Sequence, residues 1–135
     1  MLFRWLSVIL WAAFIFYLSS IPDLRSALPD FWDLVLRKFA HAGEYAVLAI
    51  LLVRAIGIAR NSPSTKLKSW RSFGAIDGSV TTVLAVVALY ALSDEIHQSF
   101  VPGRVASLFD MGVDVIGGSI GLLAYFRWTQ MSNQK

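Results

Sequence analysis

The chain has 135 residues, of which 56% are hydrophobic, and its mean hydropathy is +0.60. A soluble domain is rarely so apolar, so the composition indicates an integral membrane protein. The absence of cysteine excludes disulfides, thiolate metal sites and cysteine nucleophiles. The net charge of +3 does not indicate a nucleic-acid partner, because in a membrane protein the distribution of charge matters more than its sum.

The first apolar segment, residues 5–21, approaches the length of a membrane span. We expect a retained helix rather than a signal peptide, because no small-residue cleavage pattern precedes the acidic linker. Pro22 is expected to end this helix. The linker, residues 22–37, carries aromatic side chains of the kind found at membrane interfaces, and it predicts an interfacial turn or a short helix over residues 30–36.

Three further apolar stretches predict membrane spans over residues 39–59, 79–100 and 108–128. A polar, basic loop, residues 60–78, separates the first two, and Pro102-Gly103 predicts a tight turn between the last two. In the last span, the spacing of Gly117 and Gly121 allows close helix approach. The expected fold is therefore all-α: one domain, residues 1–135, containing four transmembrane helices and an interfacial segment after the first.

The basic residues predict the orientation of this bundle. They gather near Arg4, in the loop 60–78 and at the C-terminal end, which lie on one side of a four-span chain. The linker 22–37 is charge-balanced, and the turn 101–106 holds Arg104 alone. By the positive-inside rule, both termini are expected in the cytoplasm, and the linker and the turn on the outer side.

Polar residues recur at one depth, near the expected outer ends of the last three spans. Helical phase groups them on one face of each span. The groups are Lys38, His41 and Tyr45 with Glu44 at the edge; Tyr90, Asp94, His97 and Gln98, with Glu95 pointing away from Asp94; and Ser107, Asp110 and Asp114. Because a charge exposed to lipid costs about 2.5–3.5 kcal/mol on insertion scales, we expect the three faces to turn inward and share one outward-opening polar pocket.

Two interpretations of His41 and His97 are open. They are either structural side chains bonded to Glu44 and Asp94, or to each other's acids, or catalytic acids and bases that Glu44 and Asp94 orient. A metal site is a third option, because His41-x-x-Glu44 and Asp94-x-x-His97 each place two ligand types on one face. Lys38 and Arg104 would repel a cation, however, so no metal or other cofactor is expected.

Lys38 and Arg104 have two compatible roles. They neutralise buried acids, or they hold an anionic headgroup, for which the guanidinium group of arginine gives a fork-like phosphate contact. The other candidate substrate-binding residues are Tyr45, Glu95, Gln98, Ser107, Asp110 and Asp114. For Ser107, the N-cap of the last span is favoured over a nucleophile. The glycines at 117, 118 and 121 are interpreted as packing residues.

These motifs resemble those of the VanZ-like family. The matching stretches are Lys38-x-x-His41-x-x-Glu44-Tyr45, Asp94-Glu95-x-His97-Gln98-x-Phe100-Val101-Pro102-Gly103-Arg104, Ser107-x-x-Asp110 with a following glycine, and Leu18-Ser19-Ser20-x-Pro22. The resemblance covers nearly the whole chain outside the loop 60–78 and the tail. It implies a small multi-pass protein of the bacterial cytoplasmic membrane, linked in its founding member to reduced teicoplanin susceptibility, with no settled biochemical activity.

Two functional hypotheses of different classes follow. In the first, the pocket faces the extracytoplasmic side and binds or acts on a phosphate-bearing lipid or cell-wall precursor. In the second, the protein is a non-enzymatic structural or interaction protein whose charges only hold the helices together. A carrier is disfavoured, because the polar residues occupy only the outer half of the spans. A homodimer is compatible with both hypotheses, because four helices are few for an enclosed pocket.

Overall fold

The computed structural model describes residues 2–22, 29–57 and 78–132, and this part of the chain is helical apart from short turns. The helices are α1 (Leu2–Ser19), α2 (Asp30–Ile56), α4 (Gly78–Gln98) and α5 (Leu108–Ser132). All four are long and apolar enough to cross a membrane. The predicted all-α fold with four membrane-length helices is therefore confirmed. The loop 60–78, apart from its last residue, and residues 23–28 of the linker lie outside the described residues.

Helix α2 is one continuous helix of 27 residues, so the short interfacial helix expected over residues 30–36 is instead its first two turns. Pro29 precedes the helix, and Asp30 and Asp33 in the first turn complement the positive end of the helix dipole. At 1.5 Å per residue α2 is roughly 40 Å long, which exceeds the hydrocarbon thickness of a bilayer. The helix ends at Gly57, whose φ of 78° is left-handed and whose N–H donates to the Val53 carbonyl.

The closest helix pair is α2 with α5, and two glycines explain it. A Cβ built on Gly117 would lie 2.6 Å from Cα of Ala42, and one on Gly121 would lie 2.7 Å from Cα of Ala46. Only glycine permits this approach of two backbones, so the predicted packing role is confirmed. Helix α4 packs on the same pair, with the side chain of Val87 against Gly118. Helix α2 thus contacts all three other helices.

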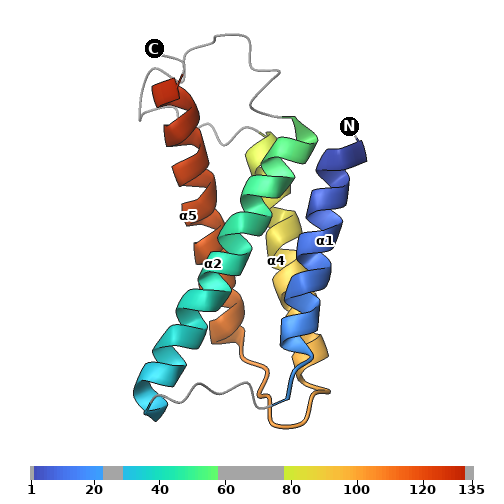
Figure 1. Ribbon diagram of the computed structural model, residues 1–135, viewed down its shortest axis with the longest axis vertical. Helices are drawn as coiled ribbons and strands as arrows, with labels where there is room; N and C mark the ends of the chain where they lie inside the picture. Colours follow the sequence, from blue (N-terminus) through green and yellow to red (C-terminus); the bar gives the residue numbers. More distant parts are fainter. Residues whose placement is uncertain (1, 23–28, 58–77, 133–135) are drawn as a thin grey trace.

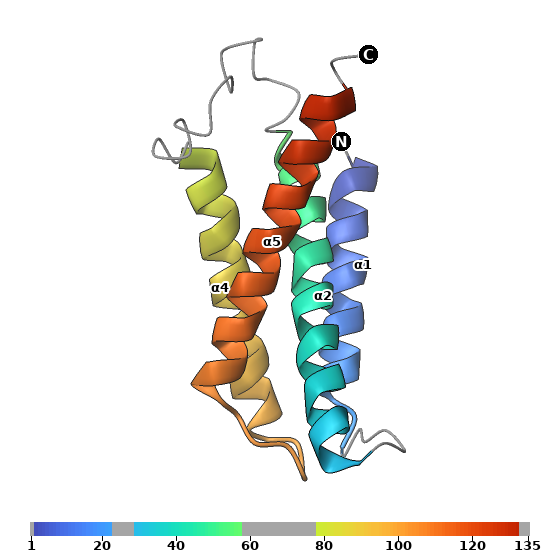
Figure 2. The same cartoon turned by 90° about the vertical axis from the view of Figure 1, so that its left-hand side faces the viewer.

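The two ends of the bundle differ in chemistry. The end of α1, the start of α2 and the connection between α4 and α5 lie together at one end, and both chain termini lie at the other (Figures 1 and 2). The apolar core includes Ile15, Leu48, Leu52, Val83 and Val87. The predicted polar residues all belong to the end that holds the α4–α5 connection, which we call the polar end.

Candidate functional site

Asp94 joins α1 to α4 at the polar end. Its side chain is buried, and its Oδ2 accepts hydrogen bonds from Ser19 Oγ (2.8 Å) and Gln98 Nε2 (2.9 Å). The expected partner of Asp94 was His97, one turn away on the same helix. The structure instead pairs Asp94 with a serine of another helix, because the end of α1 lies against this face of α4.

His97 also contacts α1 rather than an acid. Its Nε2 lies 2.9 Å from Ser20 Oγ, and its ring stacks on Phe16 with the ring centroids 4.0 Å apart. The Leu18-Ser19-Ser20 stretch therefore supplies one hydroxyl to Asp94 and the next to His97. These contacts indicate that His97 positions α1, which is closer to the structural interpretation of this residue than to the catalytic one.

A second set of charged groups joins α2 to α5. Lys38 forms an ion pair with Asp110, so its expected neutralising role is present. His41 Nδ1 lies 3.4 Å from Oδ1 of Asp114, which is completely buried. The expected partner of His41 was Glu44 or Asp94. Asp114 replaces them because the glycine contacts one and two turns further along α5 bring this helix against α2.

Glu95 and Ser107 together define the start of α5. Glu95 Oε2 accepts a hydrogen bond of 2.5 Å from the Ser107 backbone N–H, and Ser107 Oγ accepts one of 3.2 Å from the Phe109 N–H. Ser107 is therefore the N-cap of α5, as predicted, and the carboxylate of Glu95 satisfies a further backbone donor there. Glu95 does not line the cavity described below.

We expect Ser107→Ala to lower the free energy of unfolding by about 1 kcal/mol, the usual cost of losing an N-cap hydroxyl. Thermal unfolding in detergent measures the change. Ser99→Ala is the matched control, because among the described residues its hydroxyl bonds only to the Ile96 carbonyl, three residues earlier at the end of α4. An equal or larger loss in the control would contradict the capping role.

Arg104 contacts α1 instead of the acids that it was expected to neutralise. Its Nε donates to the Ile21 carbonyl (3.2 Å) and its Nη2 donates to the Leu18 carbonyl (3.0 Å). The Leu18 carbonyl also accepts a hydrogen bond of 3.2 Å from the Ile21 N–H, so Arg104 adds a second donor there and gives the Ile21 carbonyl, just beyond α1, a side-chain donor. A turn from Val101 to Arg104, with Pro102 second and Gly103 third at φ 81°, positions the side chain and confirms the predicted tight turn.

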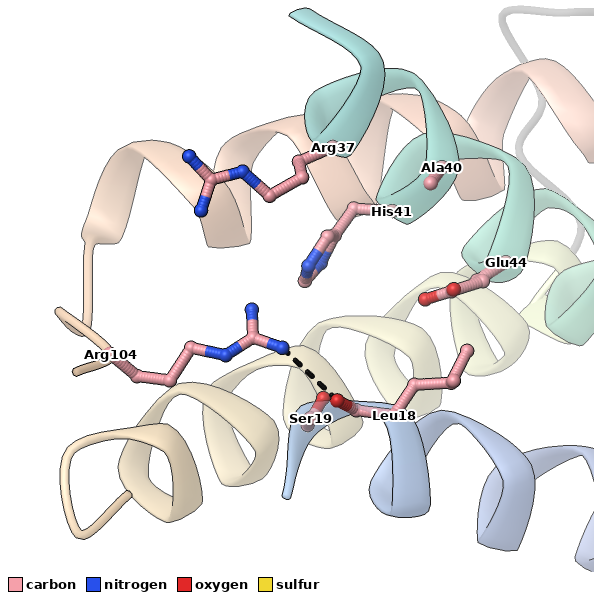
Figure 3. Close-up of a pocket in the computed structure, with 7 residues that line it drawn as sticks. All are labelled: Leu18, Ser19, Arg37, Ala40, His41, Glu44 and Arg104. Carbon is pink, nitrogen blue, oxygen red and sulfur yellow. Dashed lines mark hydrogen bonds between the residues drawn. The ribbon is translucent and has the colours of Figure 1, made fainter. Parts of the chain in front are cut away.

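A small cavity of about 50 Å³ lies between the end of α1, the first turns of α2 and Arg104, and it is partly open to the surface (Figure 3). Its lining residues are Leu18, Ser19, Arg37, Ala40, His41, Glu44 and Arg104. A volume of this size holds a few water molecules or one small polar group. We call it the α1–α2 pocket.

Of the predicted site residues, the structure brings His41, Glu44 and Arg104 to this pocket. The others lie in two adjoining contacts, between α1 and α4 and around the start of α5. Tyr45 is fully buried, and its hydroxyl has no hydrogen-bond partner among the described residues. The polar faces of the three helices predicted one shared pocket. The structure instead has a smaller cavity, flanked by charged contacts between helices.

Sequence reasoning missed Arg37 and Ser19. Arg37 lies one turn before His41 and two turns before Glu44, so helical phase carries the signal once α2 is known to begin at Asp30. Its Nη2 contacts Asp33 Oδ2 at 3.0 Å, and its buried Nε has no hydrogen-bond partner in the described part of the chain. In the same part of the chain, no group of three or more potential ligands is placed to hold a metal ion.

Four membrane-length helices with a cluster of charged residues at one end define a small multi-pass membrane protein. A family model described as VanZ/LLP1 matches residues 3–129, and the chain belongs to this family. The family resemblance predicted from the motifs is thus confirmed over nearly the whole chain. Searches of curated proteins and of solved structures found no match.

Proposed function

We propose that this protein binds the headgroup of a phosphate-bearing lipid or lipid-linked cell-wall precursor in the α1–α2 pocket. The observation that carries the proposal is that two arginines, Arg37 and Arg104, and His41 line one cavity at the polar end of the bundle. We place this end at the extracytoplasmic face of the bacterial cytoplasmic membrane. The family's association with glycopeptide resistance leads us to propose reduced teicoplanin susceptibility as the outcome.

The two arginines suit a phosphate better than Lys38, which the sequence analysis named beside Arg104. Lys38 is paired with Asp110 and does not line the pocket, whereas Arg104 is fixed by two carbonyl groups and directs its remaining terminal nitrogen across the pocket (Figure 3). Arg37 lines the pocket although its Nη2 also contacts Asp33. A guanidinium group held in this way loses little side-chain entropy when it binds an anion. Arg37 lies on the opposite wall, so a phosphate between them would meet donors from two sides.

His41 is the residue in position for proton transfer if the headgroup is processed as well as bound. Its ring points into the pocket (Figure 3), and its Nδ1 lies 3.4 Å from Oδ1 of Asp114. Asp114 would then orient the imidazole and stabilise its charged form, the role that the sequence assigned to Glu44. His97 is not in position for proton transfer to a headgroup in the pocket, because its ring lies against Phe16 and Ser20.

The orientation is tested by cysteine labelling, which the absence of native cysteine makes clean. Val105→Cys, at a position 83% exposed in the α4–α5 connection, is expected to react with a membrane-impermeant maleimide added to intact cells. Ser132→Cys, at the other end of the bundle, is expected to react only after the membrane is opened. The reverse pattern would place the pocket on the cytoplasmic side and overturn the proposal.

Binding is tested with Arg37→Gln, which keeps most of the side-chain length but removes the charge. We expect the affinity of the purified protein for dioleoylphosphatidylglycerol, measured from the rise in unfolding temperature during titration, to fall about tenfold or more, because a lost hydrogen bond between charged groups has this effect. Arg54→Gln is the control, since Arg54 lies near the other end of α2. Equal affinities in both variants and the wild type would contradict the proposal.

A structural or interaction role is the second candidate, and the charged contacts between helices favour it. Lys38, Asp94, Asp114 and Arg104 all contact groups on another helix. The two histidines separate the candidates. Under the binding proposal, His41→Ala removes the teicoplanin phenotype even at temperatures at which the variant is still folded, although its unfolding temperature falls because buried Asp114 loses its contact with His41. Under the structural alternative, the phenotype of each variant follows its loss of stability, with His97→Ala affected at least as strongly.

A further inference from the structure

Glu44 differs from the other acids of the polar end. Asp94, Glu95 and Asp110 bond to protein groups, and Asp114 lies against His41. Glu44 lines the α1–α2 pocket and is only partly exposed, yet within the described residues its carboxylate has no hydrogen bond or ion pair. Its backbone carbonyl, by contrast, accepts a hydrogen bond of 2.9 Å from Trp11 Nε1, which fixes the position of this turn of α2.

A partly buried carboxylate without a partner is costly, because desolvation is not repaid by a hydrogen bond. The pocket separates this carboxylate from the arginines. Figure 3 shows the guanidinium groups of Arg37 and Arg104 toward one end, the His41 ring between, and Glu44 at the other end. A ligand that satisfies both ends carries a negative group and a positive group a short distance apart.

We propose that the headgroup bound in the pocket is zwitterionic, with its phosphate at Arg37 and Arg104 and a primary ammonium group at Glu44. A phosphoethanolamine head has this chemistry. This inference rests on the proposed function and specifies its ligand. At Glu44, the volume of about 50 Å³ favours a primary ammonium group over a trimethylammonium group, because the first occupies about the space of a water molecule and the second is several times larger.

The flank of α2 beside the pocket favours a lipid over a free headgroup. Ala40 lines the pocket and is itself exposed, and a Cβ built on Gly43 would meet no atom within 4 Å. Small residues on this exposed surface of α2 next to the pocket leave room for the glycerol and the first methylene groups of a lipid. Its acyl chains would then stay in the bilayer while its head reaches Glu44.

The test titrates the purified full-length protein with dioleoyl lipids that share their tails and differ in the head: phosphatidylethanolamine, phosphatidylcholine and phosphatidylglycerol. From the shift in unfolding temperature, we expect phosphatidylethanolamine to bind about tenfold more tightly than either of the others, the effect of one additional hydrogen bond between charged groups. Glu44→Gln is expected to remove this preference over phosphatidylglycerol. Asp30→Asn, an equal change of charge at an exposed position of α2, should retain it.

The outcomes separate this inference from the proposed function. If the three lipids bind with equal affinity and Arg37→Gln weakens their binding, the zwitterionic headgroup is overturned and the proposal of anion binding still holds. If Arg37→Gln changes the affinity for none of the three lipids, both the zwitterionic headgroup and the proposed function are overturned. Competition by soluble phosphoethanolamine at concentrations similar to those of the lipid supports the zwitterionic site and identifies the free headgroup as its ligand. The lipid series on the wild-type protein remains decisive if Glu44→Gln does not fold.

Discussion

Replacing both Gly117 and Gly121 with alanine is expected to separate α2 from α5 and to cost upwards of about 3 kcal/mol in the free energy of unfolding. The added methyl groups would meet the α2 backbone at Ala42 and Ala46, at distances that no side-chain rotation relieves. Relief requires α5 to move away from α2, which weakens the Lys38–Asp110 and His41–Asp114 contacts at the polar end.

Circular dichroism during heating in detergent, with size-exclusion chromatography, measures this effect. The matched control is Gly43→Ala with Gly112→Ala, which changes two helical glycines, one on α2 and one on α5, at positions where an added Cβ meets nothing within 4 Å. Because alanine is the better helix former, the control is expected to be neutral or to gain about 0.5–1 kcal/mol per site. Equal losses in the two double variants would contradict the role of close approach at Gly117 and Gly121.

The second large effect is expected for Asp94→Ala. This change removes the acceptor of two hydrogen bonds and leaves the buried side chains of Ser19 and Gln98 without it. With about 1.5–3 kcal/mol for each hydrogen bond to a charged group, the loss approaches the whole stability of a small domain. The end of α1 is expected to detach from α4, although the contact between α2 and α5 remains.

Asp94→Asn provides the comparison for this prediction. Asparagine keeps an oxygen that accepts hydrogen bonds from Ser19 and Gln98 but has no charge, so most of the stability is expected to return. The measurement is the unfolding temperature, combined with disulfide cross-linking between cysteines introduced at Phe16 and His97, whose rings lie in contact. Efficient cross-linking in Asp94→Ala would contradict the detachment of α1.

The fold followed from the sequence because length and hydropathy determine which segments can cross a bilayer. The helix ends were harder to predict. The aromatic residues at 31 and 32 indicated a separate interfacial segment, but no residue between positions 30 and 56 interrupts the helix, and α2 continues through both segments. Because the start of α2 was predicted too late in the sequence, Arg37 was assigned to the linker and not to the helix face that carries His41 and Glu44.

The partners of the polar residues could not be read from the phase of each helix. Phase states which side chains share a face, but not which helix that face meets. Thus His41 was paired with residues at similar depth, whereas the glycines of α5 select Asp114 as its neighbour. Arg104 shows a second limit of the sequence, because its partners are backbone carbonyl groups at and just beyond the end of α1, and every residue type presents the same carbonyl.

The contact between Arg104 and α1 also bears on how the protein is made. The Leu18 and Ile21 carbonyls are synthesised 86 and 83 residues before the arginine that binds them. While the later helices are still being translated and inserted, the Ile21 carbonyl is left without this donor, and the Leu18 carbonyl has only the nearby Ile21 N–H among the contacts seen in the described residues. Closure of this end of the bundle by Arg104 therefore has to follow the synthesis of α4.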